Sequence, residues 1–263
     1  MSEGYNSPKE IAKAFCDFGI YKSETKLAKF IVLAILGGAY IALGGLLSVM
    51  VAGGMPTTYV ENPGLVKFVA GALFPVGLIM VSVAGADLFT SDCAGMVLPV
   101  MQKKKTMNDL IKIWVLSYTF NFVGTQFVAY YMATETGLVT HEPWQHYLHT
   151  YSAAKVNQDF YTVFIKGIGA NWLVCLGTWM GFSAKDITGK SLGTWIPVML
   201  FVTLGFEHSI ANMFFIPAAI YSGADITWTQ FIYQNLIPAT LGNVVGGAGL
   251  VGMVYGYLYL ERK

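Results

Sequence analysis

Long apolar runs dominate the chain, and short polar segments separate them. Four of these runs are uninterrupted, at residues 30–52, 113–134, 161–184 and 226–260. A transmembrane helix needs about 20 apolar residues to cross roughly 30 Å of hydrocarbon, and each run supplies them. Two further apolar runs contain a polar interruption. The pattern predicts an all-α integral membrane protein with six transmembrane helices, of which the second and fifth are broken.

Both interruptions place acidic and polar residues at membrane depth. The second run ends at Asp87, which opens a polar stretch over residues 87–92, and then resumes as a short apolar piece. The fifth run is interrupted at Glu207-His208. A charged side chain at that depth costs about 2.5–3.5 kcal/mol on insertion scales, so ionisable residues there are functional-site candidates. For His208 considered alone, the alternative is a buried histidine with satisfied hydrogen bonds.

The two interruptions recur at a fixed spacing together with a second motif. Asp87 and Glu207 lie 120 positions apart. Asn121-Phe122-Val123-Gly124 and Asn243-Val244-Val245-Gly246 lie 122 positions apart. Three spans in each half give the halves opposite orientations, and in such an inverted 3+3 repeat the broken helices meet near the midplane and frame a substrate path. A chance match between glycine-rich apolar runs is the alternative.

A weaker match extends the repeat to the first and fourth runs. It pairs Gly38-Ala39-Tyr40 with Gly169-Ala170-Asn171-Trp172, which contains one extra residue. This pairing predicts that the first and fourth helices are equivalent in the two halves.

The basic residues favour cytoplasmic chain termini. With the N-terminus inside, 13 of the 16 lysines and arginines fall on inner segments, Arg262 and Lys263 among them. Only Lys67, Lys155 and Lys166 remain for the outer side or the span behind it. Because positive charge is retained on the cytoplasmic side, we expect both termini in the cytoplasm and the protein in the cell membrane.

The first 29 residues form a segment of their own. Ser7-Pro8-Lys9-Glu10 has the residues of a helix start, with an N-cap serine, a proline at N1 and a glutamate at N3. The helix that follows is amphipathic, which suits the membrane surface or the protein's own cytoplasmic face. We therefore divide the chain into a cytoplasmic segment, residues 1–29, and a six-span domain, residues 30–263.

Composition supports a membrane protein and excludes other classes. Of the residues, 55% are hydrophobic and 12% charged, about half the usual charged fraction. A net charge of +1 provides no basic surface for nucleic acid. The three cysteines lack metal-site spacing, and His146 and His149 with Glu142 fit a solvated loop better than a metal site. No cofactor or metal is expected.

Three motifs together closely resemble the formate/nitrite transporter family. They are Glu207-His208-Ser209-Ile210-Ala211-Asn212-Met213, Asp87-Leu88-Phe89-Thr90-Ser91 and Asn171-Trp172-Leu173-Val174-Cys175-Leu176. Relatives usually carry glutamate where Asp87 stands. The resemblance covers nearly the whole chain. It implies an aquaporin-like protomer with an amphipathic N-terminal helix, a homopentamer with one pore in each protomer, and passage of small monovalent anions such as formate, nitrite or hydrosulfide.

The resemblance also assigns residues to the pore. It makes His208 the central pore histidine, with Thr90 facing it from the first broken helix. It places Lys155 and Asn171 on the approach from outside. The remaining pore candidates are apolar residues, of which Leu88 shares the motif of Thr90 and the others are placed on constrictions by spacing: Leu88, Phe201, Phe74 and Leu78.

An anion can cross an apolar constriction in two ways, and the sequence leaves both open. Lys155 and half-helix N-termini could supply a fixed positive field. Alternatively, protonation makes a neutral acid, with His208 lending the proton or, when protonated, holding the anion. Protons are therefore possible partners. We expect Glu207 and Asp87 to accept backbone hydrogen bonds and fix the broken segments.

Asn212 and Ser91 join the candidates for fixing the loops at the helix breaks. The role of Lys166, inside the fourth run, stays open between a vestibule, a neighbouring protomer and lipid headgroups. The consecutive lysines at residues 103–105 suit contact with anionic lipid of the bilayer.

Formate is the first-choice substrate, and other functions remain as alternatives. Phe214-Phe215-Ile216-Pro217 resembles the formate-type branch of the family more than the nitrite-type branch. A nitrite or hydrosulfide channel of the same family is the first alternative. A neutral-solute channel of the aquaporin type would need paired Asn-Pro-Ala motifs, which are absent. An intramembrane enzyme would need further catalytic groups, and the chain has neither HExxH nor GxSxG, so no enzyme is expected.

Overall fold

The computed structural model describes residues 4–260, and within that range its regular structure is helical. Arg262 and Lys263, two of the basic residues counted above, lie outside the described residues. In chain order the helices are α1 (Pro8–Glu24), α2 (Leu27–Gly53), α3 (Pro56–Glu61), α4 (Pro63–Leu73), α5 (Val76–Ala84), α6 (Phe89–Gly95), α7 (Val97–Met101), α8 (Met107–Phe127), α9 (Trp144–Val156), α10 (Phe160–Ser183), α11 (Ile187–Leu204), α12 (Ser209–Tyr221), α13 (Trp228–Gln230), α14 (Ile237–Val244) and α15 (Val254–Tyr259). Three π-helical segments continue them: η1 (Val128–Glu135), η2 (Phe231–Leu236) and η3 (Val245–Met253).

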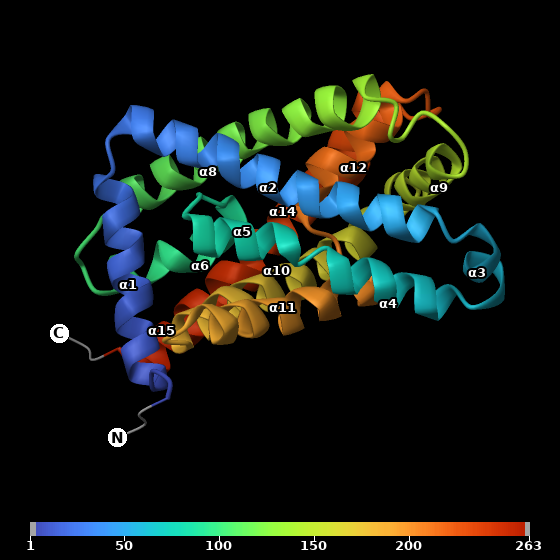
Figure 1. Cartoon of the computed structure of the whole chain (residues 1–263). Helices are drawn as coiled ribbons and strands as arrows, with labels where there is room; N and C mark the ends of the chain where they lie inside the picture. Colours follow the sequence, from blue (N-terminus) through green and yellow to red (C-terminus); the bar gives the residue numbers. More distant parts are fainter. Residues whose placement is uncertain (1–3, 261–263) are drawn as a thin grey trace.

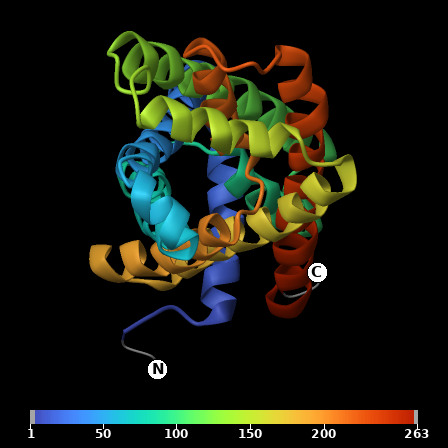
Figure 2. The ribbon, with the colours of Figure 1, turned by 90° about the vertical axis from the view of Figure 1, so that its right-hand side faces the viewer.

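The long helices run side by side, and a short helix crosses each end of the bundle. Figure 1 shows α1 lying across one end, beside both chain termini. The helices α3 and α9 lie at the opposite end. Figure 2 views the bundle from that end, where α9 lies across it. Both chain ends and α1 are therefore on the same side of the molecule.

Five helical stretches are long and apolar enough to cross a membrane: Leu27–Gly53, Pro63–Ala84, Phe160–Ser183, Ile187–Leu204 and Trp228–Tyr259. Two shorter apolar helices, Phe89–Met101 and Ser209–Tyr221, continue the second and fourth of these. The helices α8 and η1 occupy the third apolar run of the sequence. The protein is therefore a multi-pass, all-helical membrane protein.

Both interruptions seen in the sequence coincide with breaks between helices. The helix α5 ends at Gly85, whose φ of 82° is left-handed, and α6 begins at Phe89. The helix α11 ends at Gly205, whose φ is 73°, and α12 begins at Ser209. Glycine adopts this conformation without the steric penalty of a Cβ atom, so each helix stops at the same kind of signal.

Two buried asparagines fix the two breaks with the same set of hydrogen bonds. Asn121 Oδ1 accepts the N–H of Phe89 at 2.9 Å, and its Nδ2 donates to the carbonyls of Asp87 at 2.9 Å and Ala34 at 2.7 Å. Asn243, 122 positions later, does the same in the second half. Its Oδ1 accepts the N–H of Ser209 at 2.8 Å, and its Nδ2 donates to the carbonyls of Glu207 at 2.9 Å and Gly167 at 2.8 Å. The equivalent contacts show that the spacing in the sequence reflects a structural repeat.

The register of the first and fourth helices differs from the pairing expected above. Ala34 and Gly167, which occupy equivalent places, are 133 positions apart. A Cβ on Gly124 would collide with the carbonyl of Ile35, and a Cβ on Gly246 would collide with that of Ile168, again 133 apart. The Gly38–Gly169 pairing, offset by 131, is wrong by two residues. The offset changes after the first helix because α3 and its flanking loops lengthen that connection in the first half only.

The N-terminal helix begins as predicted and packs on the protein itself. Ser7 caps α1 in a complete capping box with Glu10. The buried ring of Phe15 meets the edges of Trp179 and Phe182, with centroids 5.7 Å and 5.3 Å away. The sequence left two settings open for this helix, the membrane surface and the protein's own face. The structure shows its apolar face packed on the protein.

Candidate functional site

The two broken helices meet through one side-chain contact. Thr90, in the first turn of α6, and His208, directly before α12, are both buried. The Thr90 hydroxyl lies 3.0 Å from His208 Nε2. The resemblance paired these two residues, and the structure brings them together across 118 positions of sequence.

The second nitrogen of His208 determines the tautomer of the ring. His208 is the N-cap of α12, and its Nδ1 accepts the N–H of Ala211 at 3.0 Å. An accepting ring nitrogen carries no proton, so the neutral ring has its hydrogen on Nε2 and donates it to Thr90. In this geometry His208 is a neutral hydrogen-bond donor whose other nitrogen is occupied by the helix.

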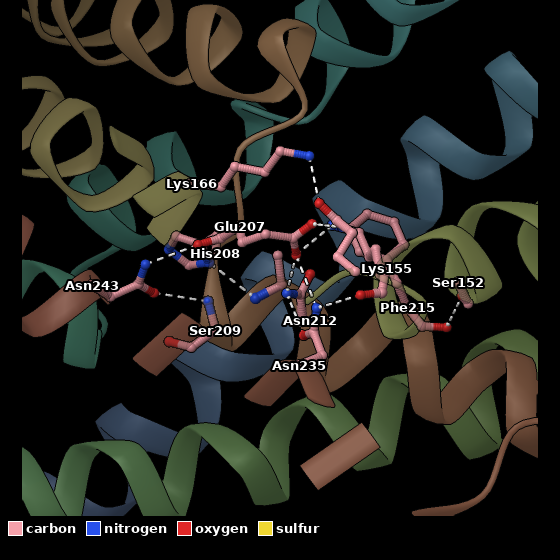
Figure 3. A network of polar contacts seen from close by, with 12 residues as sticks. Ser152, Lys155, Lys166, Glu207, His208, Ser209, Asn212, Phe215, Asn235 and Asn243 are labelled. Atoms are coloured by element: carbon pink, nitrogen blue, oxygen red, sulfur yellow. Dashed lines mark hydrogen bonds and ion pairs between the residues drawn. The ribbon is translucent and has the colours of Figure 1, made fainter. Parts of the chain in front are cut away.

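Glu207 is fixed by side-chain donors, which corrects one expectation. Its Oε2 accepts from Lys155 Nζ at 3.0 Å, Asn212 Nδ2 at 2.7 Å and Asn235 Nδ2 at 3.2 Å, and its Oε1 accepts from Gln158 Nε2 at 3.1 Å. Figure 3 shows these groups converging on the carboxylate. We expected backbone N–H donors, but within residues 4–260 the break's backbone is bonded by Asn243 instead. The carboxylate joins α9, α12 and η2.

The same correction applies to Asp87 at the first break. Its carboxylate pairs with Lys22 of α1 at 2.8 Å and accepts from the Ser117 hydroxyl at 2.5 Å. Lys22 also pairs with Asp92 of α6. All three charged side chains are buried. A helix at one end of the bundle is thereby joined to the first break by ion pairs that the sequence reasoning missed.

A signal for Lys22 is present in the sequence once the register is known. Lys22 lies 133 positions before Lys155, the offset that relates α2 to α10. Each lysine lies over an aromatic ring four positions earlier, Phe18 at 4.1 Å and Tyr151 at 5.0 Å. Thus α1 and α9 are equivalent in the repeat, and each supplies a buried lysine to the acidic residue of its break.

A cavity lies on each side of the contact between Thr90 and His208. The α9-side cavity, of about 10 Å³, is lined by Phe74, Tyr151, Lys155, Phe201, Val202, Phe206, His208, Ala211, Asn212 and Phe215. The α1-side cavity, of about 90 Å³, is lined by Phe18, Lys22, Val81, Ser82, Gly85, Ala86, Leu88, Ser91, Thr178, Gly181, Phe182 and Lys190. A cavity needs roughly 10–15 Å³ to hold one water molecule, so the α9-side cavity is a narrow point.

The predicted apolar residues flank the central contact. The ring of Phe201 stacks on His208 at 5.6 Å between centroids and meets the edge of Phe74 at 5.9 Å. Leu88 lines the α1-side cavity. Leu78 is fully buried in the same core cluster as these residues.

Asn171 is a buried packing residue of α10, whereas Ser91 lines the α1-side cavity. Asn171 is fully buried, and its Nδ2 donates to the carbonyl of Asn243 at 2.7 Å. The thiol of Cys175 lies 3.2 Å from the carbonyl oxygen of Thr90 and 3.6 Å from Asn171 Oδ1. Asn171 is not among the residues that line the two cavities described above. The Ser91 hydroxyl lies 3.1 Å from that of Thr178, in the lining of the α1-side cavity.

His149 lies on α9, outside the membrane-spanning helices, and packs against the end of α12. Its Nε2 lies 3.0 Å from the Ser222 hydroxyl, and burial lowers its pKa from the usual value. The bond ties α9 to the end of α12, so the arrangement supports a structural role for this histidine.

Comparisons with known proteins match nearly the whole chain to one transporter family. A model of the formate/nitrite transporter family matches residues 9–257. The chain is 45% identical to a probable formate transporter of Methanothermobacter thermautotrophicus over 100% of both chains, and 38% identical to a formate channel of Bacillus thuringiensis over 98% of this chain and 97% of that protein. A solved pentameric formate channel with formate bound is 32% identical, covers 89% of this chain and 98% of its own, and superposes with a TM-score of 0.76.

Proposed function

Because the chain belongs to the formate/nitrite transporter family, we propose that it passes small monovalent anions of weak acids, formate first, through a pore centred on His208. The observation that carries this proposal is the 3.0 Å contact between Thr90 and His208, which joins the two breaks between a cavity on each side. Nitrite and hydrosulfide are further substrates in this proposal. The protein is a transporter and not an enzyme.

The proposed topology has six crossings of the cell membrane, with both termini on the cytoplasmic side. Residues 1–29 then form the cytoplasmic segment, with the pore domain following. The helices α1 and α15 lie at the same end of the bundle, which supports an even number of crossings (Figure 1). We further propose a homopentamer with one pore in each protomer, supported by the pentameric structure to which the chain is similar. The exposed apolar helix faces then meet lipid and neighbouring protomers.

The tautomer of His208 indicates how the anion crosses the narrow point. Removing a bare anion from water costs several kcal/mol or more unless hydrogen bonds replace the solvent. When an anion replaces the contact between them, the Nε2–H of His208 and the hydroxyl of Thr90 both donate to it. The apolar rings of Phe74 and Phe201 exclude water on one side, and Leu88 does so on the other.

His208 is a poor proton donor in this geometry. The neutral ring can lend a proton only after Nδ1 has been protonated, because loss of the Nε2 hydrogen from a neutral imidazole is far too costly near neutral pH. Protonation of Nδ1 would break the cap bond to Ala211. We therefore propose that a proton, where one crosses with the substrate, comes from solvent and that His208 supplies hydrogen bonding.

Uptake into proteoliposomes tests the proposed function. Vesicles that contain the purified protein should take up labelled formate faster than protein-free vesicles, and unlabelled nitrite and hydrosulfide should compete. Osmotic swelling without formate uptake would instead identify a neutral-solute channel. Equal formate uptake with and without protein would rule out the proposal.

A further inference from the structure

Lys166 is a charged residue inside α10 that the path described so far does not use. Its ammonium donates to Gln158 Oε1 at 2.5 Å, and Gln158 Nε2 donates in turn to Glu207 Oε1 at 3.1 Å. Figure 3 shows the Lys166 side chain extending past Glu207 toward the side where Lys155 lies. A single carboxylate is therefore shared by two ammonium groups, one in direct contact and one through an amide.

The charges at this break do not balance. Lys155 pairs directly with Glu207 at 3.0 Å and is buried. Two asparagines, Asn212 and Asn235, complete the hydrogen bonds of the same carboxylate oxygen. Two positive charges and one negative charge leave a surplus of one positive charge around Glu207, whose partners Lys155 and Asn212 line the α9-side cavity. We assign that surplus to Lys166, because its ammonium donates to the neutral amide of Gln158.

The other half of the repeat lacks this surplus. The N–H of Glu207 donates to the carbonyl of Lys166 at 3.4 Å, and the N–H of Asp87 donates to the carbonyl of Leu33 at 3.0 Å. Leu33 is thus the counterpart of Lys166, 133 positions earlier. At the first break Lys22 faces two carboxylates, and the half-buried Lys190 in the lining of that cavity brings the local charge only to zero.

We propose that Lys166 captures the anion on its way to the α9-side cavity and sets the affinity for the small carboxylate. This inference rests on the proposed function. Gln158 keeps the ammonium beside Glu207, whose partner Lys155 lines the cavity. An anion that arrives there takes the place of the amide oxygen, since a charge-assisted hydrogen bond is stronger than one to a neutral amide. Lys155 stays paired with Glu207 and fixes the break.

Formate influx measured over a range of formate concentrations tests the assignment. Lys166→Gln keeps a donor toward Gln158 and removes the charge. It should raise the half-saturating formate concentration roughly three- to tenfold and leave the maximal flux close to wild type, because a rim charge acts mainly on capture. Lys166→Arg should stay near wild type. Lys112→Gln, at an exposed lysine of α8 that lines neither cavity, is the matched control and should change nothing.

The outcomes separate this inference from the proposed function. Wild-type flux together with an unchanged half-saturating concentration in Lys166→Gln would overturn the role of Lys166 and leave the channel function intact. If wild type carries no formate, the proposed function fails, and binding of labelled formate to the solubilised protein decides the inference: equal binding by wild type and Lys166→Gln overturns it. If Lys166→Gln does not assemble, the half-saturating formate concentration of wild type is measured at low and at high ionic strength. A value that does not change with ionic strength would also overturn the role of Lys166.

Discussion

Replacing Asn243 with alanine should destabilise the second break. The substitution removes the partner of the Ser209 N–H and one partner each of the Glu207 and Gly167 carbonyls. Gly167 keeps its place in the regular hydrogen bonding of α10, so the Ser209 N–H and the Glu207 carbonyl are the main groups left without a partner. An unsatisfied buried polar group costs about 1–3 kcal/mol, so two such groups give roughly 2–6 kcal/mol for Asn243→Ala.

The thermal unfolding midpoint of the detergent-solubilised protein measures this loss. For a chain of this size a loss of 1 kcal/mol lowers the midpoint by about 2–4 °C, so a loss of about 2–6 kcal/mol gives a fall of roughly 4–24 °C. Asn157→Ala, at an exposed position after α9, is the matched control and should change the midpoint little. If the two variants unfold at the same temperature, Asn243 does not fix the break and the reasoning fails.

Two further predictions concern α1. Lys22→Ala leaves Asp87 and Asp92 buried without a counter-ion and should cost about 3–5 kcal/mol of stability. A lower unfolding midpoint and faster proteolysis of α1 should follow, whereas Asp92→Asn should stay near wild type. Equal midpoints for Lys22→Ala and wild type would contradict the ion cluster. The hydrogen bond from the Ser7 side chain, followed by that from its backbone, lowers the pKa of Glu10, so the capping box is complete at neutral pH and is lost as pH falls through that lowered pKa. Hydrogen exchange at the start of α1 should therefore lose protection in acid relative to the start of α2, which has no side-chain cap. Constant relative protection would argue against the box.

Sequence spacing predicted the breaks but not the groups that fix them. The 120- and 122-residue offsets could be read directly because Asp87, Glu207, Asn121 and Asn243 are polar residues in apolar runs. Their partners could not, since the donors to Glu207 come from three elements whose meeting depends on the fold. Backbone fixing was assigned to the acidic residues because they flank the breaks, but an amide serves better there: it both accepts and donates, and a carboxylate only accepts.

The solvated loop predicted for His146 and His149 is wrong, because both residues lie on the helix α9. This helix lacks a side-chain N-cap and has polar and aromatic residues around its whole circumference, so no apolar stripe marks it. Its equivalence to α1 is visible only through the 133-residue offset. That offset is obscured in the sequence by the insertion of α3, and the glycine motif used to align the first and fourth helices gave a register two residues away.

The role of Lys166 depends on side-chain geometry that a sequence does not contain. A lysine in an apolar helix could face lipid headgroups, a neighbouring protomer or a vestibule. Its hydrogen bond to Gln158, eight positions earlier, directs it to the carboxylate of Glu207. The rotamers of all three side chains are needed to recognise the shared charge.

Formate flux through His208 variants in proteoliposomes tests the central claim most directly. His208→Asn retains both an acceptor for the Ala211 N–H and a donor toward Thr90, whereas His208→Leu retains neither. If neutral hydrogen bonding at this position carries the anion, the asparagine variant should keep flux within about tenfold of wild type, a loss of about 1.4 kcal/mol, and the leucine variant should lose it while still assembling. Wild-type formate flux through a correctly assembled His208→Leu protein would contradict the account.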